Sequence, residues 1–298
     1  MQISGIFPAL VTPYDQTGAV SLPAIQHNIR LYNQTEVAGY VVLGSTGESV
    51  MLSSEEADSI LRKAKECAAP GKLLIAGTGA ESTTETIVRT KRAAELGYSV
   101  ALVKTPYYYK PVYKPETYLQ HYRAVADASP IPLLLYSVPQ FTGVTLETPE
   151  ILALSEHPNI AGIKDSSGVI QRIAEVVGAA RADFQVLTGG AAVIYSAMVV
   201  GARGAILALA SALPEQCAQL YEYVCAGQLE RAKEVQLKLA QASKRIVSEC
   251  GIAGVKFAMD LRGYQGGLPR LPLLPLKEDK KQQIAAIVSA LHPAVASV

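Results

Sequence analysis

Cysteine and histidine are scarce in this sequence, and neither residue clusters. The 298 residues include four cysteines and four histidines, none of which form a C-x-x-C or an H-x-x-x-H pair. Zinc sites and helical metal sites generally require such spacings. A disulfide framework is also not expected, because the cysteines are few and far apart in a long chain. We therefore predict free cysteines and no bound metal ion.

Charge and long apolar runs are also limited. Charged residues make up 18% of the chain, and the formal net charge is +1. Nucleic-acid-binding domains usually carry a strong positive charge, so no nucleic-acid partner is expected. The sequence has no run of about 18 apolar residues, the length that a membrane span needs, and its first residues lack the pattern of a secretory signal. We expect a cytoplasmic protein without a membrane partner.

Hydrophobic residues, by contrast, are abundant and follow a regular pattern. They make up 49% of the chain, which is typical of a globular protein with a large core. Eight short runs rich in valine, isoleucine, leucine and alanine are typical of strands in a parallel sheet that is covered on both faces. The predicted strands are residues 3–12, 40–44, 73–77, 100–105, 133–138, 160–164, 185–188 and 205–210.

The segments between these runs have the spacing of amphipathic helices. One of them begins at Ser53-Ser54-Glu55-Glu56, which provides a cap and an acidic first turn. The predicted helices are residues 21–32, 53–68, 83–96, 115–128, 148–157, 169–180, 191–200 and 214–226. This alternation predicts the α/β class and a (β/α)8 TIM barrel over residues 1–227. Residues 228–298 are predicted to form a helical C-terminal region, with helices at 229–250, 254–262 and 277–291.

Lysines at strand ends are the first candidates for chemistry, since TIM-barrel active sites lie at the carboxyl ends of the strands. Lys164 follows the apolar run 160–163, so its side chain is expected to point into the barrel. Burial lowers the pKa of a lysine and yields the nucleophilic amine that imine formation needs. Lys104 follows an equally apolar run, and Lys164 could instead pair with Asp165. The local sequence leaves these alternatives open.

Hydroxyl groups follow other predicted strands. Tyr136 stands at the end of an apolar run, where a phenol could relay protons to a carbinolamine or could simply be a half-buried aromatic residue. Ser45 and Thr46 lie between two glycines ahead of a predicted helix, a loop that suits a carboxylate. The tyrosine-rich stretch 107–113 is interpreted as a lid or a subunit contact.

Five motifs in this order resemble the dihydrodipicolinate synthase/N-acetylneuraminate lyase family of class I aldolases, over essentially the whole chain. The motifs are Gly44-Ser45-Thr46-Gly47-Glu48, Thr105-Pro106-Tyr107-Tyr108, Tyr136-Ser137-Val138-Pro139 with Thr142-Gly143, Gly162-Ile163-Lys164-Asp165, and Thr188-Gly189. The resemblance implies a cofactor-free enzyme, a lyase that holds a 2-oxo acid such as pyruvate as a Schiff base.

The resemblance also implies roles for individual residues. Lys164 would form the Schiff base, and Tyr136 and Thr46 would relay protons. Ser45 with Thr46 would bind the carboxylate of the 2-oxo acid, and Tyr108 would reach a neighbouring subunit's site in a homotetramer built from dimers. The remaining predicted pocket residues are Ser166, next to the distal end of the substrate, and Gly189 and Ile206, through their backbone carbonyls.

Phe141 is one departure from the synthase pattern. Dihydrodipicolinate synthases have an arginine there, which binds the carboxylate of aspartate semialdehyde, and its loss should cost about 2–4 kcal/mol of binding. Phe141 suggests a more apolar second substrate. The segments that look most like a 4-hydroxy-2-oxoglutarate aldolase are 129–139, His157-Pro158-Asn159-Ile160 and Lys164-Asp165-Ser166. A dihydrodipicolinate (4-hydroxy-tetrahydrodipicolinate) synthase or a sugar-acid dehydratase or lyase of the same family is the alternative. Outside enzymes, the alternative is a metabolite-binding barrel.

Overall fold

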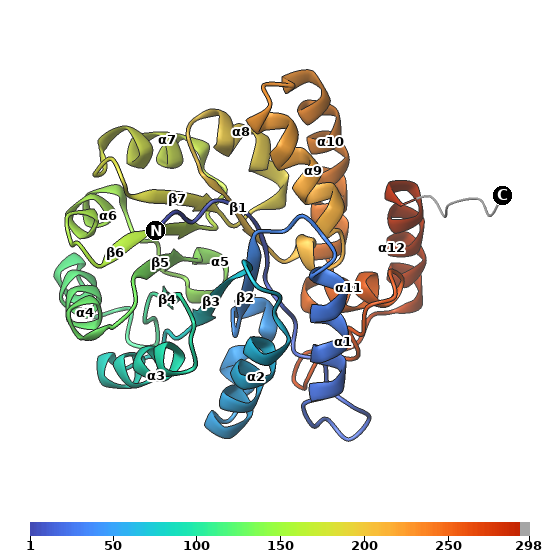
Figure 1. The fold of residues 1–298 in the computed structure, drawn as a ribbon, viewed down its shortest axis with the longest axis horizontal. Coiled ribbons are helices and arrows are strands. Elements are labelled where there is room, and N and C mark those ends of the chain that lie inside the picture. Colours follow the sequence, from blue (N-terminus) through green and yellow to red (C-terminus); the bar gives the residue numbers. More distant parts are fainter. Residues whose placement is uncertain (293–298) are drawn as a thin grey trace.

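Eight parallel strands form the centre of the molecule in the computed structural model, which describes residues 1–292 (Figure 1). The strand order is β1-β8-β7-β6-β5-β4-β3-β2. The strands are β1 (Gly5–Pro8), β2 (Gly39–Val42), β3 (Leu73–Gly77), β4 (Val100–Lys104), β5 (Leu133–Ser137), β6 (Ile160–Asp165), β7 (Gln185–Thr188) and β8 (Gly204–Leu207). Single hydrogen bonds close the barrel between β1 and β2, from the Ala38 N–H to Ile6 O and from the Leu10 N–H to Val41 O. The predicted TIM barrel is confirmed.

Helices surround this barrel on the outside (Figure 1). They are α1 (Leu22–Tyr32), α2 (Ser54–Cys67), α3 (Thr83–Glu95), α4 (Pro115–Ala128), α6 (Thr148–Ser155), α7 (Ile170–Ala179), α8 (Ile194–Val199) and α9 (Pro214–Cys225). The short helix α5 (Pro139–Thr142) directly follows β5 and lies within the ring of helices (Figure 1). The predicted cap of α2 is present, because the Ser53 side chain accepts from the Glu56 N–H while the Glu56 side chain accepts from the Ser53 N–H. None of the helices within residues 1–292 has both the length and the apolar character of a membrane span.

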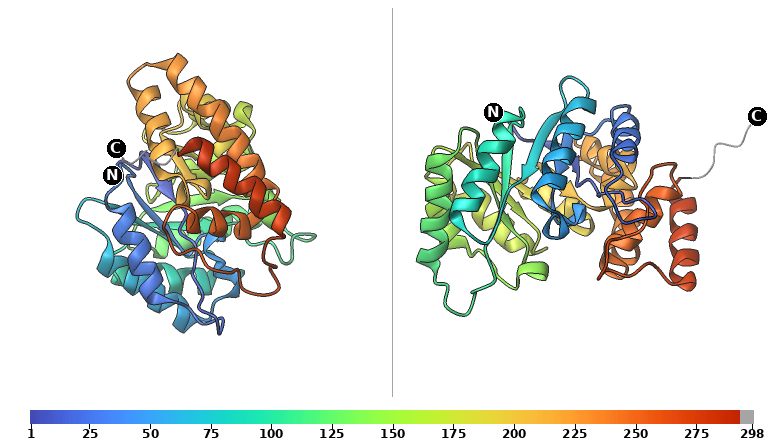
Figure 2. Two further views of the ribbon diagram at one scale, coloured as in Figure 1. Left: turned by 90° about the vertical axis from the view of Figure 1, so that its right-hand side faces the viewer. Right: turned by 90° about the horizontal axis from the view of Figure 1, so that it is seen from below.

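Three further helices lie together on one side of the barrel, with α12 outermost (Figures 1 and 2). They are α10 (Leu229–Ala242), α11 (Gly251–Asp260) and α12 (Glu278–Leu291). The predicted helix 229–250 is divided, since α10 passes into a π-helical turn at Ser243–Ser248 before α11 starts. The boundary between a barrel domain, 1–227, and a C-terminal region, 228–298, stays a prediction, and residues 293–298 lie outside the described part.

The first and the last predicted strand continue well past the point where the strands in the structure end. The first, predicted as 3–12, is β1 over Gly5–Pro8, because beyond Pro8 the chain makes single hydrogen bonds alternately to β8 and β2. The last, predicted as 205–210, is β8 over Gly204–Leu207. It ends where the chain turns into a 3-10 turn at Leu209–Ser211, which is held by the Ser211 hydroxyl donating to Ala9 O. Apolarity continues past the end of both strands, so the pattern alone overestimates their length.

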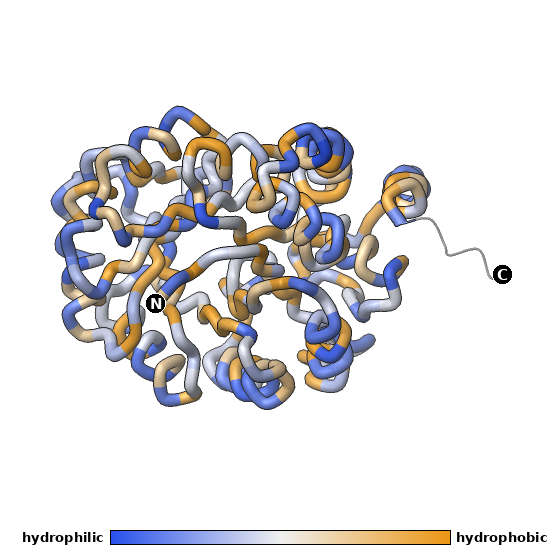
Figure 3. The backbone as a smooth tube through the Cα atoms, turned by 45° about the horizontal axis from the view of Figure 1, so that its top comes forward, coloured by the Kyte–Doolittle hydropathy of each residue, from blue (hydrophilic) through white to orange (hydrophobic). Residues whose placement is uncertain are grey.

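Apolar side chains fill the barrel and the layer between strands and helices. Inside the barrel, Phe7, Val41, Leu102, Leu134 and Leu187 pack together and are fully or almost fully buried. Along the outer helices hydrophobic and hydrophilic residues alternate, as expected for helices with one face on the barrel (Figure 3). The filled interior leaves the carboxyl ends of the strands as the place for a cavity.

Candidate active site

A cavity of about 340 Å³ lies at the carboxyl ends of the strands. Most of the residues predicted from the sequence line it together. They are Ser45, Thr46, Tyr136, Phe141, Lys164, Ser166, Gly189 and Ile206. They come from strands and loops that are far apart in the sequence, and the barrel brings them to one end.

Lys164 lies on β6, directly beside Tyr136 on β5. The two residues are paired in the parallel register of these strands. Lys164 is only 5% exposed, and its Nζ lies 4.0 Å from the centroid of the Tyr136 ring. A lysine amine in a buried cavity next to a phenol has the surroundings that imine formation and proton transfer require.

The Tyr136 phenol is acidified by its neighbours. Burial by itself would raise the pKa of Tyr136, but the positive charge of Lys164 and hydrogen bonds from Ser45, Lys164 and Ser166 outweigh this effect and lower the pKa below its ordinary value. The Ser45 hydroxyl lies 3.4 Å from the Tyr136 hydroxyl. The phenol therefore connects the lysine to the hydroxyl loop, which is the path a proton relay would take.

The hydroxyl loop is a short 3-10 turn, Ser45–Gly47, after the end of β2. Its carbonyl at Gly47 accepts a 2.6 Å hydrogen bond from the buried Thr12 hydroxyl. Ser45 and Thr46 of this turn line the same cavity as Lys164. Two hydroxyls close to the amine suit the carboxylate of a 2-oxo acid, which is bonded directly to the reacting carbon.

Lys104, the other lysine that the sequence left open, belongs to a different contact. Its Nζ pairs with Glu81 at 3.2 Å and lies 4.9 Å from the centroid of the Tyr107 ring. Glu81 also accepts from the backbone N–H groups of Tyr107 and Tyr108, at 2.9 Å each. Lys104 thus fixes the loop after β4, whereas Lys164 lines the cavity.

Tyr108 is the predicted site residue that the structure does not bring into the cavity. Its side chain is 72% exposed and makes an edge contact with Tyr109, with ring centroids 5.0 Å apart. Both tyrosines extend from the loop between β4 and α4. The role of Tyr108 in a neighbouring subunit's site stays a prediction.

One wall of the cavity was missed by the sequence analysis. It comes from the π-helical turn and α11, which contribute Val247, Ser248, Gly251, Ile252 and Val255. Strand-end reasoning searches only the barrel, so these positions were not considered. Gly254 is a signal of this wall in the sequence, because a glycine within a helical segment can mark a close backbone contact. A Cβ at Gly254 would lie 2.2 Å from Ile246 O, so only glycine fits there.

The missed wall and Phe141 give the cavity an uncharged outer part. Phe141 lies on α5 and is 63% exposed, at the opening. Of the charged side chains in residues 1–292, only Lys164 lines this cavity. A substrate is therefore met by one amine and several hydroxyls at the inner end and by uncharged side chains at the outer end, most of them apolar but with Gln140 and Ser248 among them.

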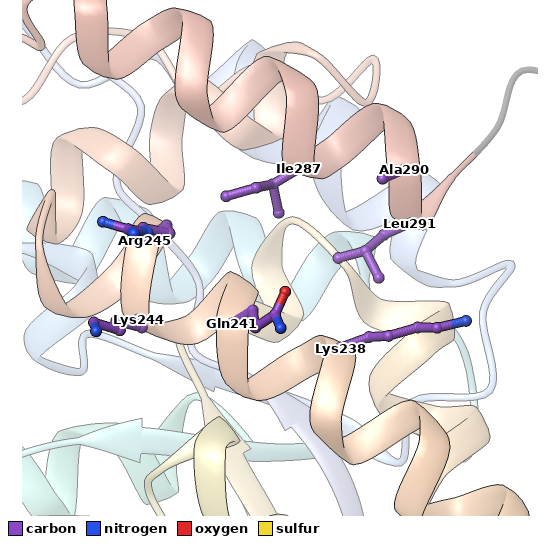
Figure 4. Close-up of a pocket in the computed structure, with 7 residues that line it drawn as sticks. All are labelled: Lys238, Gln241, Lys244, Arg245, Ile287, Ala290 and Leu291. Carbon is purple, nitrogen blue, oxygen red and sulfur yellow. The ribbon is translucent and has the colours of Figure 1, made fainter.

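A second hollow, of about 520 Å³, lies between α10, the π-helical turn and α12 (Figure 4). Lys238, Lys244 and Arg245 border it on one side, and Ile287 and Leu291 of α12 face it from the other. It is separate from the strand ends and has no nucleophile paired with an acid or base. The smaller cavity around Lys164 is therefore the candidate active site.

A lysine and a tyrosine side by side at the strand ends of a TIM barrel are the groups that a class I aldolase uses. The family model described as the dihydrodipicolinate synthetase family matches residues 2–291. The chain belongs to this family, and it is an enzyme of the pyruvate-dependent aldolase type, which makes or breaks a carbon–carbon bond.

Relatives and solved structures match the chain over nearly its full length. It is 37% identical to a 4-hydroxy-tetrahydrodipicolinate synthase of Exiguobacterium sp. over 97% of each chain, and 35% identical to one of Archaeoglobus fulgidus over 97% of this chain and 98% of that one. A dihydrodipicolinate synthase structure from Thermotoga maritima has a TM-score of 0.93 at 28% identity, covering 98% of this chain and 99% of that one. A pyruvate complex of the Acinetobacter baumannii synthase has a TM-score of 0.93 at 32% identity, covering 97% and 99%. These names do not support the 4-hydroxy-2-oxoglutarate aldolase resemblance.

Proposed function

We propose that the protein binds pyruvate as an imine on Lys164 and joins it to an aldehyde, or releases the aldehyde in the reverse direction. The observation that carries the proposal is the Lys164 amine, buried in the cavity and 4.0 Å from the ring centroid of Tyr136. The Ser45 and Thr46 hydroxyls line the same cavity and would bind the pyruvate carboxylate. Lys164, Tyr136 and Thr46 are the proposed catalytic residues.

The proposed reaction begins when the Lys164 amine attacks the ketone carbon of pyruvate. Tyr136, with Thr46, moves a proton to the carbinolamine oxygen, water leaves, and an iminium remains. Loss of a proton from the methyl group gives an enamine, whose carbon attacks the aldehyde carbon while the aldehyde oxygen takes up a proton. Water then adds to the iminium and releases the product, which restores the free lysine. The positive nitrogen serves as the electron sink in both directions.

The first candidate for the particular reaction is the 4-hydroxy-tetrahydrodipicolinate synthase reaction. Its support is the name of relatives that share 35–37% identity with the chain over 97% of its length. This reaction would use aspartate semialdehyde as the aldehyde. The position that should bind the carboxylate of aspartate semialdehyde is occupied by the uncharged Phe141. Among the described residues, no cationic side chain lines the outer part of the cavity.

The second candidate is an aldolase for 4-hydroxy-2-oxo acids, which the uncharged outer cavity favours. In 4-hydroxy-2-oxoglutarate the aldehyde half is glyoxylate, whose carboxylate is attached directly to the aldehyde carbon and so stays close to the reacting atoms. Phe141 and Ile252 then need to bind no charge. Product analysis with pyruvate and each aldehyde in turn separates the two candidates.

We also propose a homotetramer in which Tyr108 reaches the site of a neighbouring subunit. The support is the exposure of Tyr108, Tyr109 and Val112, at 72%, 63% and 70%, on one loop beside the cavity. Exposed apolar groups gathered in this way are typical of a contact surface. Sedimentation of the wild type and of Tyr108→Ala tests the assembly. A Tyr108→Ala variant that still forms the tetramer but has lost activity would support the shared site.

The imine itself is tested by borohydride reduction in the presence of pyruvate, followed by peptide mass spectrometry. We expect a stable adduct on the peptide that contains Lys164, and none without pyruvate. Lys104→Met serves as the control, because Lys104 pairs with Glu81 outside the cavity and should leave the adduct unchanged. A folded wild-type protein that forms no adduct with pyruvate or other 2-oxo acids would contradict the mechanism and favour a metabolite-binding barrel.

A further inference from the structure

The loop that carries Ser45 and Thr46 is held in a conformation that its own sequence does not favour. Leu43, at φ 61°, and Glu48, at φ 55°, are the only non-glycine residues with positive φ in residues 1–292, and they flank this loop on both sides. Such backbone is uncommon for residues with a Cβ and persists only where the surroundings enforce it. Some contact outside the loop must therefore hold Glu48 in place.

That contact is a fully buried ion pair with the C-terminal region. The Glu48 carboxylate lies 2.6 Å from the Nζ of Lys256 on α11, and both side chains are 0% exposed. The second carboxylate oxygen of Glu48 accepts a 2.9 Å hydrogen bond from the backbone N–H of Arg270. Lys256 in turn donates to Leu268 O at 2.9 Å and lies 4.5 Å from the centroid of the Tyr14 ring.

A buried ion pair is a costly way to stabilise a fold, because both charges must leave water. Burial in fact lowers the pKa of Lys256 in spite of its carboxylate partner. Well-packed apolar side chains would often serve stability equally well. What the pair adds is a fixed relative position of two backbone segments, because a short contact between opposite charges holds them at one distance.

The position of Lys256 connects the two walls of the cavity. Val255, the residue before it, lines the outer wall, while Glu48 immediately follows the Ser45–Gly47 turn of the inner wall. We infer that the Glu48–Lys256 pair is a positioning element of the active site, which sets the Ser45 and Thr46 hydroxyls at the correct distance from Lys164 and from α11. The inference rests on the proposed function, because it concerns how those hydroxyls meet the substrate carboxylate.

The test compares Lys256→Met with a lysine that holds backbone elsewhere. Lys72 donates at 2.7 Å to both Thr35 O and Val37 O and is also partly buried, but it precedes β3 at the amino ends of the strands. We expect Lys256→Met to raise the KM for pyruvate roughly 10- to 100-fold, the range caused by small misplacements of binding groups. Lys72→Met should lower the unfolding temperature while leaving that KM unchanged.

A double variant, Glu48→Gln with Lys256→Met, separates positioning from simple stability. With both charges removed no buried charge is left unpaired, so the unfolding temperature should recover toward that of the wild type. The KM for pyruvate should stay raised, because the charged contact that fixes the loop relative to α11 is then absent. The rate of borohydride-trapped imine formation at low pyruvate concentration should follow the KM in each variant. If Lys256→Met does not fold, the double variant alone decides.

Two outcomes would overturn the inference. One is a folded Lys256→Met variant that binds and traps pyruvate as the wild type does. The other is a double variant that regains both the unfolding temperature and the KM, which would leave the pair a purely structural role. A wild type that traps no imine would instead refute the proposed function and this inference with it, so the two failures are distinguishable.

Discussion

The two walls of the cavity differ in origin and in chemistry. The inner wall comes from the barrel and presents an amine, a phenol and hydroxyls, with Tyr136 in contact with both Lys164 and Ser45. The outer wall comes from α5, the π-helical turn and α11 and presents mainly apolar side chains, among them Phe141 and Ile252. The inner wall suits a step that every pyruvate-dependent member of the family must perform, whereas in the proposed function the outer wall meets the variable aldehyde.

If the proposed function is correct, the side chains that line the two walls divide the work, with reaction type set by the inner wall and substrate choice by the outer wall. A substitution on the inner wall should affect all aldehydes equally, because each reaction passes through the same imine. A substitution on the outer wall should leave imine formation intact and alter only which aldehyde is used. The following predictions test this separation.

Lys164→Ala should have the largest effect. Without the amine no imine can form, so turnover with every aldehyde should fall by more than about 10³-fold, as is usual when a nucleophile is removed. Borohydride trapping and steady-state kinetics measure this. Lys104→Met is the matched control for trapping and should retain the adduct, since Lys104 contacts Glu81 instead of the cavity. If the Lys164→Ala variant still forms an adduct, on another lysine, the assignment of Lys164 as the nucleophile is wrong.

Tyr136→Phe should reduce turnover by about 10²- to 10³-fold for all aldehydes, the usual contribution of a proton-transfer group. The pKa of the Tyr136 phenol lies below its ordinary value of 10 because Lys164 and hydrogen bonds outweigh burial. Activity should therefore fall as the pH rises through this lowered pKa, since the phenolate can no longer donate a proton. A pH–rate profile in which Tyr136→Phe keeps the same alkaline limb would remove Tyr136 from the relay.

Phe141→Arg should change the use of the aldehyde without changing the binding of pyruvate. A guanidinium at the opening would supply the missing partner for a distal carboxylate, so kcat/KM for aspartate semialdehyde should rise about 10- to 100-fold. The KM for pyruvate should not change. The matched control is Phe141→Met, which keeps an uncharged side chain and should give no such gain. If wild-type protein already uses aspartate semialdehyde as well as Phe141→Arg does, the outer wall does not decide selectivity in this way.

The sequence predicted the inner wall better than the outer one for a physical reason. Lys164 and Tyr136 end apolar strands, and parallel register alone places them side by side. The choice of Lys164 over Lys104 could not be made from the runs before them, which are equally apolar. It depends on Glu81, a residue of the loop between β3 and α3, which pairs with Lys104 outside the cavity.

The outer wall depends on tertiary contacts that no local pattern contains. Residues 229–250 have a continuous helical pattern, yet the structure inserts a π-helical turn at Ser243–Ser248 and places Val247 in the cavity. Short π-helical turns inside α-helices often occur at functional sites. Glu48 was seen only as the end of a loop motif, and its partner Lys256 is over 200 residues away, so the buried pair could not be anticipated.

Ile252→Ala should have the smallest of these effects and the most specific one. The substitution shortens a side chain of the outer wall on α11, so larger aldehydes should gain on smaller ones by about tenfold, the range for a few methyl groups in an apolar pocket. Imine formation should be unchanged, because Ile252 comes from a different wall than Lys164. Competition between two aldehydes of different size, followed by product analysis, measures the ratio.

Ile287→Ala is the matched control for this experiment, since Ile287 faces the separate hollow beside α12 and has the same chemistry. It should leave the ratio of aldehydes unchanged. Equal shifts in the two variants would mean that α11 acts through general loosening of the C-terminal helices, and a changed KM for pyruvate in Ile252→Ala would mean that the two walls are not independent. A changed ratio of the two aldehyde products in Ile252→Ala, but not in Ile287→Ala, would show that the outer wall contacts the aldehyde directly.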